Sequence, residues 1–205
     1  MEVELNKALL CAAISLSAVS YAGSAQAEIF GKEEVISTNI SQFSKWNDVV
    51  ARQETSIKDN SSMEIKAWEK DIALFKELST TRQKIEAVNN YINARVEYRP
   101  DIEVWGKTDY WASVDETLTK GYGDCDDYAI AKYFTLKEVG FSEDDMRIVV
   151  LKDHSINQIH AVLSVNVNGA EYILDNQSPY LRTDHQLTYY EPIYSINETR
   201  WWRAV

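Results

Sequence analysis

The feature that most constrains the fold of this chain is an Asn168-Gly169 pair between two short apolar segments, 161–167 and 170–174. An Asn-Gly pair in this setting is a strong signal for a β-hairpin with a two-residue turn. Such a turn also fixes the strand register, because each residue before it then has one defined partner after it. With the turn at 168–169, Asp175 is predicted to lie opposite Val162.

This register brings two polar side chains together. His160 lies two residues before Val162, so both side chains point to the same face of the sheet. His160 and Asp175 then become diagonal neighbours within reach of each other. A carboxylate so placed can accept a hydrogen bond from one ring nitrogen and orient the imidazole. Taken singly, His160 could be an ordinary strand residue and Asp175 could belong to a turn.

A third reactive residue, Cys125, stands at the start of a helix predicted from about residue 124 to 139, which Gly140 ends as a C-cap. The free N–H groups and the dipole at a helix start favour a thiolate and can hold an oxyanion. Cys125 together with His160 and Asp175 therefore predicts acyl transfer by a cysteine nucleophile. The alternative is a buried structural thiol, which usually has apolar rather than acidic neighbours.

The neighbours of Cys125 are in fact acidic: Asp124, Asp126 and Asp127. Their negative charge opposes ionisation of the thiol. One explanation is that these carboxylates simply favour the start of a helix and point to solvent. The other is a bound hard cation such as Ca²⁺, which prefers carboxylate and carbonyl oxygens. In that case residues 105–109 could supply carbonyl ligands.

The first half of the chain is predicted to be helical, with Ser79-Thr80-Thr81 as a cap. Apolar residues recur there at helical spacing in three groups: Phe43, Trp46, Val49 and Val50; Ile65, Trp68, Ile72, Phe75 and Leu78; Ile85, Val88, Ile92 and Val96. Residues 101–123 are predicted to form a loop that carries Trp105, Tyr110 and Trp111. The second half adds a third β segment at 147–151, and His154 and His185 are expected to be exposed. The order of elements predicts an α+β fold, with the nucleophile helix packed on a small antiparallel sheet.

The N-terminus predicts export. An apolar run from Ala8 to Val19 is too short to span a bilayer, and Ala25-Gln26-Ala27 is typical of a signal-peptidase site. We therefore predict a signal peptide at 1–27 and one domain at 28–205; an amphipathic N-terminal helix is the alternative. Removal of the signal removes Cys11 and leaves Cys125 as the only thiol. The formal net charge of −11 at pH 7 argues against binding to nucleic acid or to an anionic membrane surface.

Several short motifs resemble those of a known family. They are Gly-Asp-Cys-Asp-Asp-Tyr-Ala at 123–129, preceded by Trp111 and Gly121, then His-Ala-Val-Leu at 160–163 and Leu-Asp-Asn at 174–176. In order and spacing they resemble the bacterial transglutaminase-like cysteine peptidases, of papain/transglutaminase-like fold, and within these the LapG type of periplasmic protease. The resemblance covers nearly all of residues 28–205. One departure is Asp126, where the family often has Glu.

The resemblance implies a Cys125-His160-Asp175 triad and a Ca²⁺ requirement, with Asp124, Asp126 and Asp127 as ligands. It also implies a periplasmic enzyme that cuts the N-terminal region of a large surface adhesin at an Ala-Ala pair, which releases the adhesin and disperses the biofilm. The implied regulator is an inner-membrane cyclic-di-GMP receptor of the LapD type, whose periplasmic domain sequesters the protease. Two alternatives stay open: a transglutaminase or amidase acting on protein side chains, and a catalytically inactive periplasmic binding protein.

Overall fold

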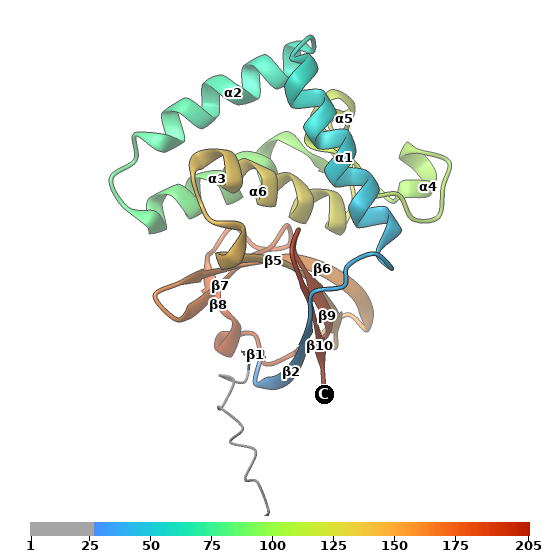
Figure 1. The fold of residues 1–205 in the computed structure, drawn as a ribbon, viewed down its shortest axis with the longest axis vertical. Coiled ribbons are helices and arrows are strands. Elements are labelled where there is room, and N and C mark those ends of the chain that lie inside the picture. Colours follow the sequence, from blue (N-terminus) through green and yellow to red (C-terminus); the bar gives the residue numbers. More distant parts are fainter. Residues whose placement is uncertain (1–26) are drawn as a thin grey trace, which may run out of the picture.

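The computed structural model describes residues 27–205, in which helices gather on one side and a curled β-sheet on the other (Figure 1). The helices are α1 (Ser44–Asp59), α2 (Met63–Lys76), α3 (Thr81–Arg95), α4 (Asp101–Val104), α5 (Val114–Lys120) and α6 (Cys125–Val139). The strands are β1 (Ala27–Ile29), β2 (Lys32–Ser37), β3 (Glu97–Tyr98), β4 (Tyr122–Gly123), β5 (Met146–Asp153), β6 (Gln158–Val167), β7 (Ala170–Leu174), β8 (Arg182–Thr183), β9 (Tyr190–Ile196) and β10 (Trp201–Ala204). The α+β prediction is therefore confirmed.

The predicted helices are present, and their ends carry the expected caps. Thr80 caps α3 in a capping box with Gln83. Gly140 ends α6 at φ 111°, in the left-handed region that a glycine adopts without strain. The hairpin is also as predicted: Asn168 and Gly169 have φ of 54° and 85°, as a type I′ turn requires.

The sheet is larger than the three predicted strands. Eight strands pair in the order β1-β2-β10-β9-β5-β6-β7-β8, and every pairing between them is antiparallel. Strand β2 escapes prediction because several of its residues are charged. Strand β9 contains Pro192, which usually argues against a strand and here lies at a bulge opposite the step from Val150 to Leu151. The Phe30 N–H donates to Asp184 at 3.0 Å and links the two ends of the curled sheet.

The prediction of a loop over 101–123 is wrong in part, because α4 and α5 lie within it. Helix α5 begins with a capping box in which Ser113 and Glu116 satisfy each other's backbone N–H groups. Helix α4 is a single turn after Pro100, too short to leave a periodic pattern. These two helices carry the segment that faces the start of α6.

Helix α6 is the centre of the molecule, between the other helices and the sheet (Figure 1). It buries residues on all sides, as a fully enclosed helix does. Trp46 stacks on Phe134 with ring centroids 5.9 Å apart, and the Trp68 indole donates to the Thr135 hydroxyl at 2.9 Å. The tight packing along α6 fixes the position of its first residue, Cys125.

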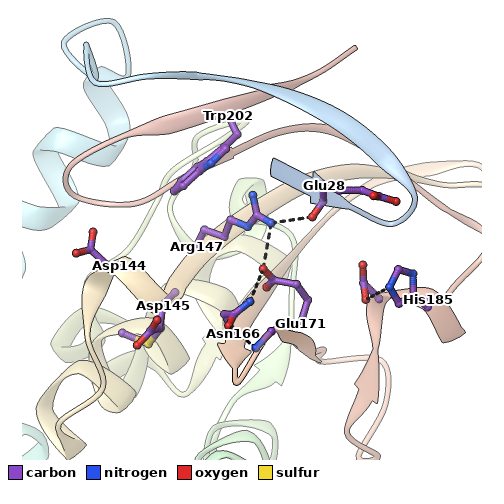
Figure 2. Close-up of a pocket in the computed structure, with 11 residues that line it drawn as sticks. Glu28, Asp144, Asp145, Arg147, Asn166, Glu171, His185 and Trp202 are labelled. Atoms are coloured by element: carbon purple, nitrogen blue, oxygen red, sulfur yellow. Dashed lines mark hydrogen bonds and ion pairs between the residues drawn. The ribbon is translucent and has the colours of Figure 1, made fainter. Parts of the chain in front are cut away.

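The inner face of the curled sheet combines a small apolar cluster, with Val149, Leu151 and Val162 among its members, and a polar network around Arg147. Figure 2 shows Arg147, from β5, bound to the carbonyl of Glu28 and the carboxylate of Glu171, beside the Trp202 ring. Arg147 also pairs with buried Glu34 at 2.6 Å. The Arg147 network borders a cavity of about 610 Å³. This cavity shares no lining residue with the cavity around Cys125 described below. Because Glu34, Arg147 and Glu171 come from β2, β5 and β7, we infer that this network stabilises the curvature of the sheet.

Within residues 27–205, no helix is both long and apolar enough to cross a membrane. The predicted signal peptide at 1–27 lies outside the described residues, apart from Ala27, which begins β1. The signal peptide and its boundary with the domain at 28–205 therefore stay predictions.

Candidate active site

Cys125 is the first residue of α6, and Asp124 is its N-cap. The Asp124 side chain accepts the N–H of Asp126 at 3.3 Å, and the Asp127 side chain accepts the N–H of Asp124 at 3.3 Å. Asp127 also accepts the N–H of Ala112 at 2.8 Å. This capping box anchors the start of the helix to the preceding loop, and it keeps the Cys125 side chain at a defined place.

Gly123 permits this close packing. A Cβ at position 123 would lie 2.7 Å from the Cβ of Asp127 and 2.8 Å from its Oδ2, closer than any side chain tolerates. The contact comes from the root of the Asp127 side chain, so rotation of the carboxylate alone cannot relieve it. A glycine is therefore required for the loop to pass so near the helix.

His160 and Asp175 lie together, as the hairpin register predicts. The observed register pairs Val167 with Ala170 and Leu163 with Leu174. His160 Nε2 lies 2.9 Å from Asp175 Oδ1, and both residues are buried. Because Nε2 is occupied by Asp175, Nδ1 is the ring nitrogen left for a second partner.

Three further groups hold Asp175 in place, and the sequence did not predict them. The Tyr190 hydroxyl donates to Asp175 Oδ2 at 2.6 Å, the Gln177 N–H donates to Oδ1 at 2.9 Å, and the Asn93 amide donates to the Asp175 carbonyl at 2.9 Å. Burial opposes ionisation of Asp175, but the hydrogen bonds from His160 and Tyr190, with the charge of His160, hold its pKa below the ordinary value. Asp175 is therefore an anion that orients the imidazole.

Cys125 and His160 line the same cavity, which has a volume of about 380 Å³. The other lining residues are Tyr98, Ile156, Gln158, Ile159, Asn176 and Gln177. His154 and His185 are exposed, as predicted, with side-chain exposures of 54% and 75%. Among the described residues, His160 is therefore the histidine placed to accept the proton of the Cys125 thiol.

The environment of the thiol disfavours its ionisation. Burial, together with the charges of Asp126 and Asp124, raises the pKa of Cys125 above its ordinary value. The backbone N–H groups of Ala161 and Asp126 act in the opposite direction. The conflict between acidic neighbours and a nucleophilic thiol, inferred from the sequence, is therefore present in the structure.

The acidic cluster is larger than the three predicted carboxylates. Oxygens of Asp101, Asp124 and Asp127 lie within 4.8 Å of one another, and so do oxygens of Asp101, Asp109 and Asp126. Asp101 and Asp109 come from α4 and the loop after it, where the sequence suggested only carbonyl ligands. No local sequence pattern identifies Asp101 and Asp109 as part of the cluster, because only the tertiary fold of this loop brings them to the start of α6.

The chemistry of the cluster fits a hard cation. Burial, with the neighbouring carboxylates, raises the pKa of Asp101 to about 6 and that of Asp127 to about 8. The Oδ1 atoms of Asp101 and Asp126 are buried and have no hydrogen-bond partner among the described residues. A Ca²⁺ ion, which prefers oxygen ligands, would give these unused buried oxygens a partner. It would also offset the repulsion among the carboxylates. The ligand roles of Asp124, Asp126 and Asp127 stay predictions.

A buried lysine lies two helical turns after Cys125. Lys132 is fully buried, and its Nζ has no hydrogen-bond partner in the described part of the chain. Burial lowers its pKa to about 7, although the charge of Asp175 acts in the opposite direction. Because the pKa is lowered on folding, the unfolded chain binds the extra proton between pH 7 and pH 10, so stability should rise with pH across this range.

We therefore expect Lys132→Met to stabilise the fold near pH 7, by on the order of 1–4 kcal/mol, because it removes a buried charge without leaving a partner unpaired. The gain over wild type should shrink as the pH rises toward 10. Urea unfolding of both proteins at several pH values measures this difference. A gain that is independent of pH would contradict the assignment of a titrating lysine.

Comparison with known proteins gives a consistent result. The profile of the family of bacterial transglutaminase-like cysteine proteinases matches residues 55–205. A structure of Legionella pneumophila LapG is 31% identical, with a TM-score of 0.62, covering 76% of this chain and 87% of that chain. EGTA-treated LapG from the same organism is 31% identical over 77% and 86% of the two chains, and calcium-bound LapG is 30% identical over 75% and 87%, each with a TM-score of 0.62. No curated protein matches the chain.

The family match spans every residue of the site described above, from Asn93 to Tyr190. The similarity to LapG covers most of both chains at an identity that indicates common descent. This chain therefore belongs to the family of bacterial transglutaminase-like cysteine proteinases and is a cysteine peptidase of the LapG type.

Proposed function

We propose that this chain is a calcium-dependent periplasmic cysteine endopeptidase that cleaves the N-terminal region of a large cell-surface adhesin. The observation that carries the proposal is the cavity that Cys125 shares with His160, whose ring is oriented by a buried Asp175. Membership of the peptidase family and the predicted signal peptide support it further. Release of the adhesin would disperse a biofilm.

The proposed mechanism uses Cys125, His160 and Asp175 as a triad. His160 takes the thiol proton at Nδ1, or holds it as an ion pair, while Asp175 stabilises the imidazolium from the other side. The thiolate attacks a peptide carbonyl, and backbone N–H groups near the start of α6 hold the oxyanion. The imidazolium then protonates the leaving amine, and water hydrolyses the thioester.

The proposed cofactor is Ca²⁺, held by the acidic cluster of Asp101, Asp109, Asp124, Asp126 and Asp127. The ion would neutralise the repulsion among these carboxylates and join the loop after Pro100 to the start of α6. This role is structural and electrostatic: no step of the reaction passes through the ion. The ion would keep Cys125 in position, because Asp124, one of its proposed ligands, caps the helix that Cys125 begins.

The function can be tested with the N-terminal fragment of a surface adhesin from the same genome. With Ca²⁺ present, we expect residues 28–205 to cut the fragment at an Ala-Ala pair, as intact-mass spectrometry and N-terminal sequencing would report. A fragment whose Ala-Ala pair is replaced by Asp-Asp should stay whole. Incorporation of an added amine without chain cleavage would instead identify a transglutaminase, and an unreactive thiol with no product would identify an inactive binding protein.

The orientation of His160 can be tested at Asp175 and Tyr190. Asp175→Asn should lower kcat by roughly 10²–10⁴-fold while leaving a residual rate, because the nucleophile and base remain but the imidazolium loses its anion. Tyr190→Phe should cost about tenfold, since one hydrogen bond to Asp175 is lost. The neighbouring Tyr189→Phe is the matched control. Equal effects of the two tyrosine changes would contradict the role of Tyr190.

The proposed regulator is the periplasmic domain of a LapD-type cyclic-di-GMP receptor, binding near residues 105–122. Trp111 is buried and cannot be an anchor, so Trp105 and Tyr110, both partly exposed, are the aromatic candidates. We expect Trp105→Ala to weaken receptor binding at least tenfold in calorimetry, and exposed Leu74→Ala on α2 to leave it unchanged. The receptor should also compete with substrate. Simultaneous binding of both with unchanged turnover would refute this interface.

A further inference from the structure

We propose that the hydroxyl of Tyr98 donates a hydrogen bond to the oxyanion that forms when the Cys125 thiolate attacks the scissile carbonyl. Tyr98 is then a catalytic residue in addition to the triad. The inference rests on the proposed peptidase function and assigns a side-chain donor to its first step. In that step the sulfur bonds to the carbonyl carbon, the π electron pair moves to the oxygen, and the hydroxyl keeps its proton while it stabilises the new charge.

The position of Tyr98 is set by a short two-stranded sheet beside the nucleophile. Strand β3 pairs with β4 in parallel, and Tyr98 lies opposite Gly123 in this pairing. The next residue, Arg99, donates its backbone N–H to the carbonyl of Gly123 at 3.0 Å. Gly123 precedes Cys125 by two residues, so the backbone of Tyr98 is tied to the loop that leads directly into the nucleophile.

The side chain of Tyr98 lies in the cavity where the reaction takes place. It lines this cavity together with Cys125 and His160, and 55% of its surface is exposed, so a bound substrate can contact it. Burial raises the pKa of Tyr98 above its ordinary value, and so do the charges of Cys125 and Asp124. The hydroxyl is therefore near the nucleophile and keeps its proton at neutral pH, as a hydrogen-bond donor must.

The cap of α6 explains why a side-chain donor is needed. The first N–H groups of a helix have no partner within the helix and can hold an oxyanion. Here the Asp124 carboxylate already accepts the N–H of Asp126 at 3.3 Å, and in the capping box it also accepts the N–H of Asp127. In the first turn of α6, this leaves the N–H of Cys125 as the group that the cap does not use. A hydroxyl from Tyr98 would supply the second donor.

The three amide side chains in the cavity lie on the side of the imidazole. Gln158 precedes His160 by two residues on β6, and residues 176–177 directly follow Asp175. The imidazolium protonates the leaving amine, so the leaving group has to face this side. The oxyanion is a different substituent of the same tetrahedral carbon and points elsewhere. Tyr98 is tied instead to the loop before α6, which favours its hydroxyl over these amides.

The first test compares Tyr98→Phe with wild type on the adhesin fragment, with Ca²⁺ present. The change keeps the ring and removes only the hydroxyl. We expect kcat to fall about 10²-fold with KM nearly unchanged, because removal of one oxyanion donor costs roughly this much. Tyr180→Phe is the matched control, since Tyr180 is 72% exposed and does not line the cavity. A raised KM with an unchanged kcat would overturn the proposal, because the hydroxyl would then only bind substrate.

The second test separates the oxyanion from the thiol. Iodoacetamide alkylates Cys125 without forming an oxyanion. The nitrile of acetyl-Ala-Ala instead adds the sulfur to its carbon, one C–N π bond breaks, and the thiol proton moves to the nitrogen, which then takes the place of the oxyanion. For Tyr98→Phe we expect at least tenfold weaker nitrile binding and an unchanged alkylation rate. An equal loss in both would overturn the proposal, because the hydroxyl would then act on the thiol.

These outcomes are distinct from failure of the proposed function. If wild-type protein binds the nitrile but cuts no adhesin fragment, the peptidase proposal fails, and the nitrile comparison still decides the role of Tyr98. If Tyr98→Phe cuts the fragment as fast as wild type, only this inference is wrong. Should the variant melt below wild type, the ratio of nitrile binding to alkylation decides, since a misfolded fraction lowers both. Weaker nitrile binding in Asn176→Ala but not in Tyr98→Phe would assign the donor to Asn176 and overturn the proposal.

Discussion

Cys125→Ala protein is expected to have no measurable peptidase activity and an unchanged fold. The sulfur is the proposed nucleophile that forms the acyl intermediate, so its removal should lower kcat by about 10⁵–10⁶-fold. The change is small and lies at the first residue of α6, where the capping box of Asp124 and Asp127 remains intact. Circular dichroism and the melting temperature should therefore match wild type.

Two further variants sharpen this prediction. Cys125→Ser should be equally inactive, because a hydroxyl is far less readily ionised than a thiol in the same place. His160→Ala should lose activity to a similar extent, and His185→Ala is the matched control, since His185 is an exposed histidine away from the cavity. Full activity in Cys125→Ala protein would show that the nucleophile lies elsewhere.

Exhaustive chelation of Ca²⁺ is expected to abolish activity, and added Ca²⁺ to restore it. The reason is the conflict at the start of α6, where carboxylates with unused buried oxygens crowd a thiol that must ionise. Mg²⁺ should restore activity poorly, because it demands a tighter octahedral shell and gives up water reluctantly. Turnover of the adhesin fragment after EGTA treatment and back-titration measures this effect.

Calcium binding should also stabilise the folded protein. An ion that binds only the folded state contributes about 2.7 kcal/mol at a concentration one hundred times its Kd, so the melting temperature should rise with Ca²⁺. Asp124→Ala should weaken this response most, because Asp124 joins the loop to the helix, and Asp101→Ala should weaken it too. The exposed Asp145→Ala is the control. Chelated protein that cuts at the full rate would show that the acidic cluster is only a helix cap.

The sequence by itself determined the parts of the site that depend on local geometry. The Asn168-Gly169 turn sets the register that brings His160 to Asp175, since a two-residue turn leaves one pairing. The Gly-rich turn and the apolar run after it place Cys125 at the start of a helix. Both follow from short-range rules, because the residues involved are close in the chain.

Only the tertiary structure decided which distant residues complete the site. Tyr190 reaches Asp175 because β9 pairs with β5, and Asp101 and Asp109 reach the acidic cluster because the loop after Pro100 folds across the start of α6. The pairing of β2 with β10 likewise joins the two ends of the described chain. Contacts between residues far apart in sequence leave no periodic pattern, since they depend on packing rather than on local backbone preference.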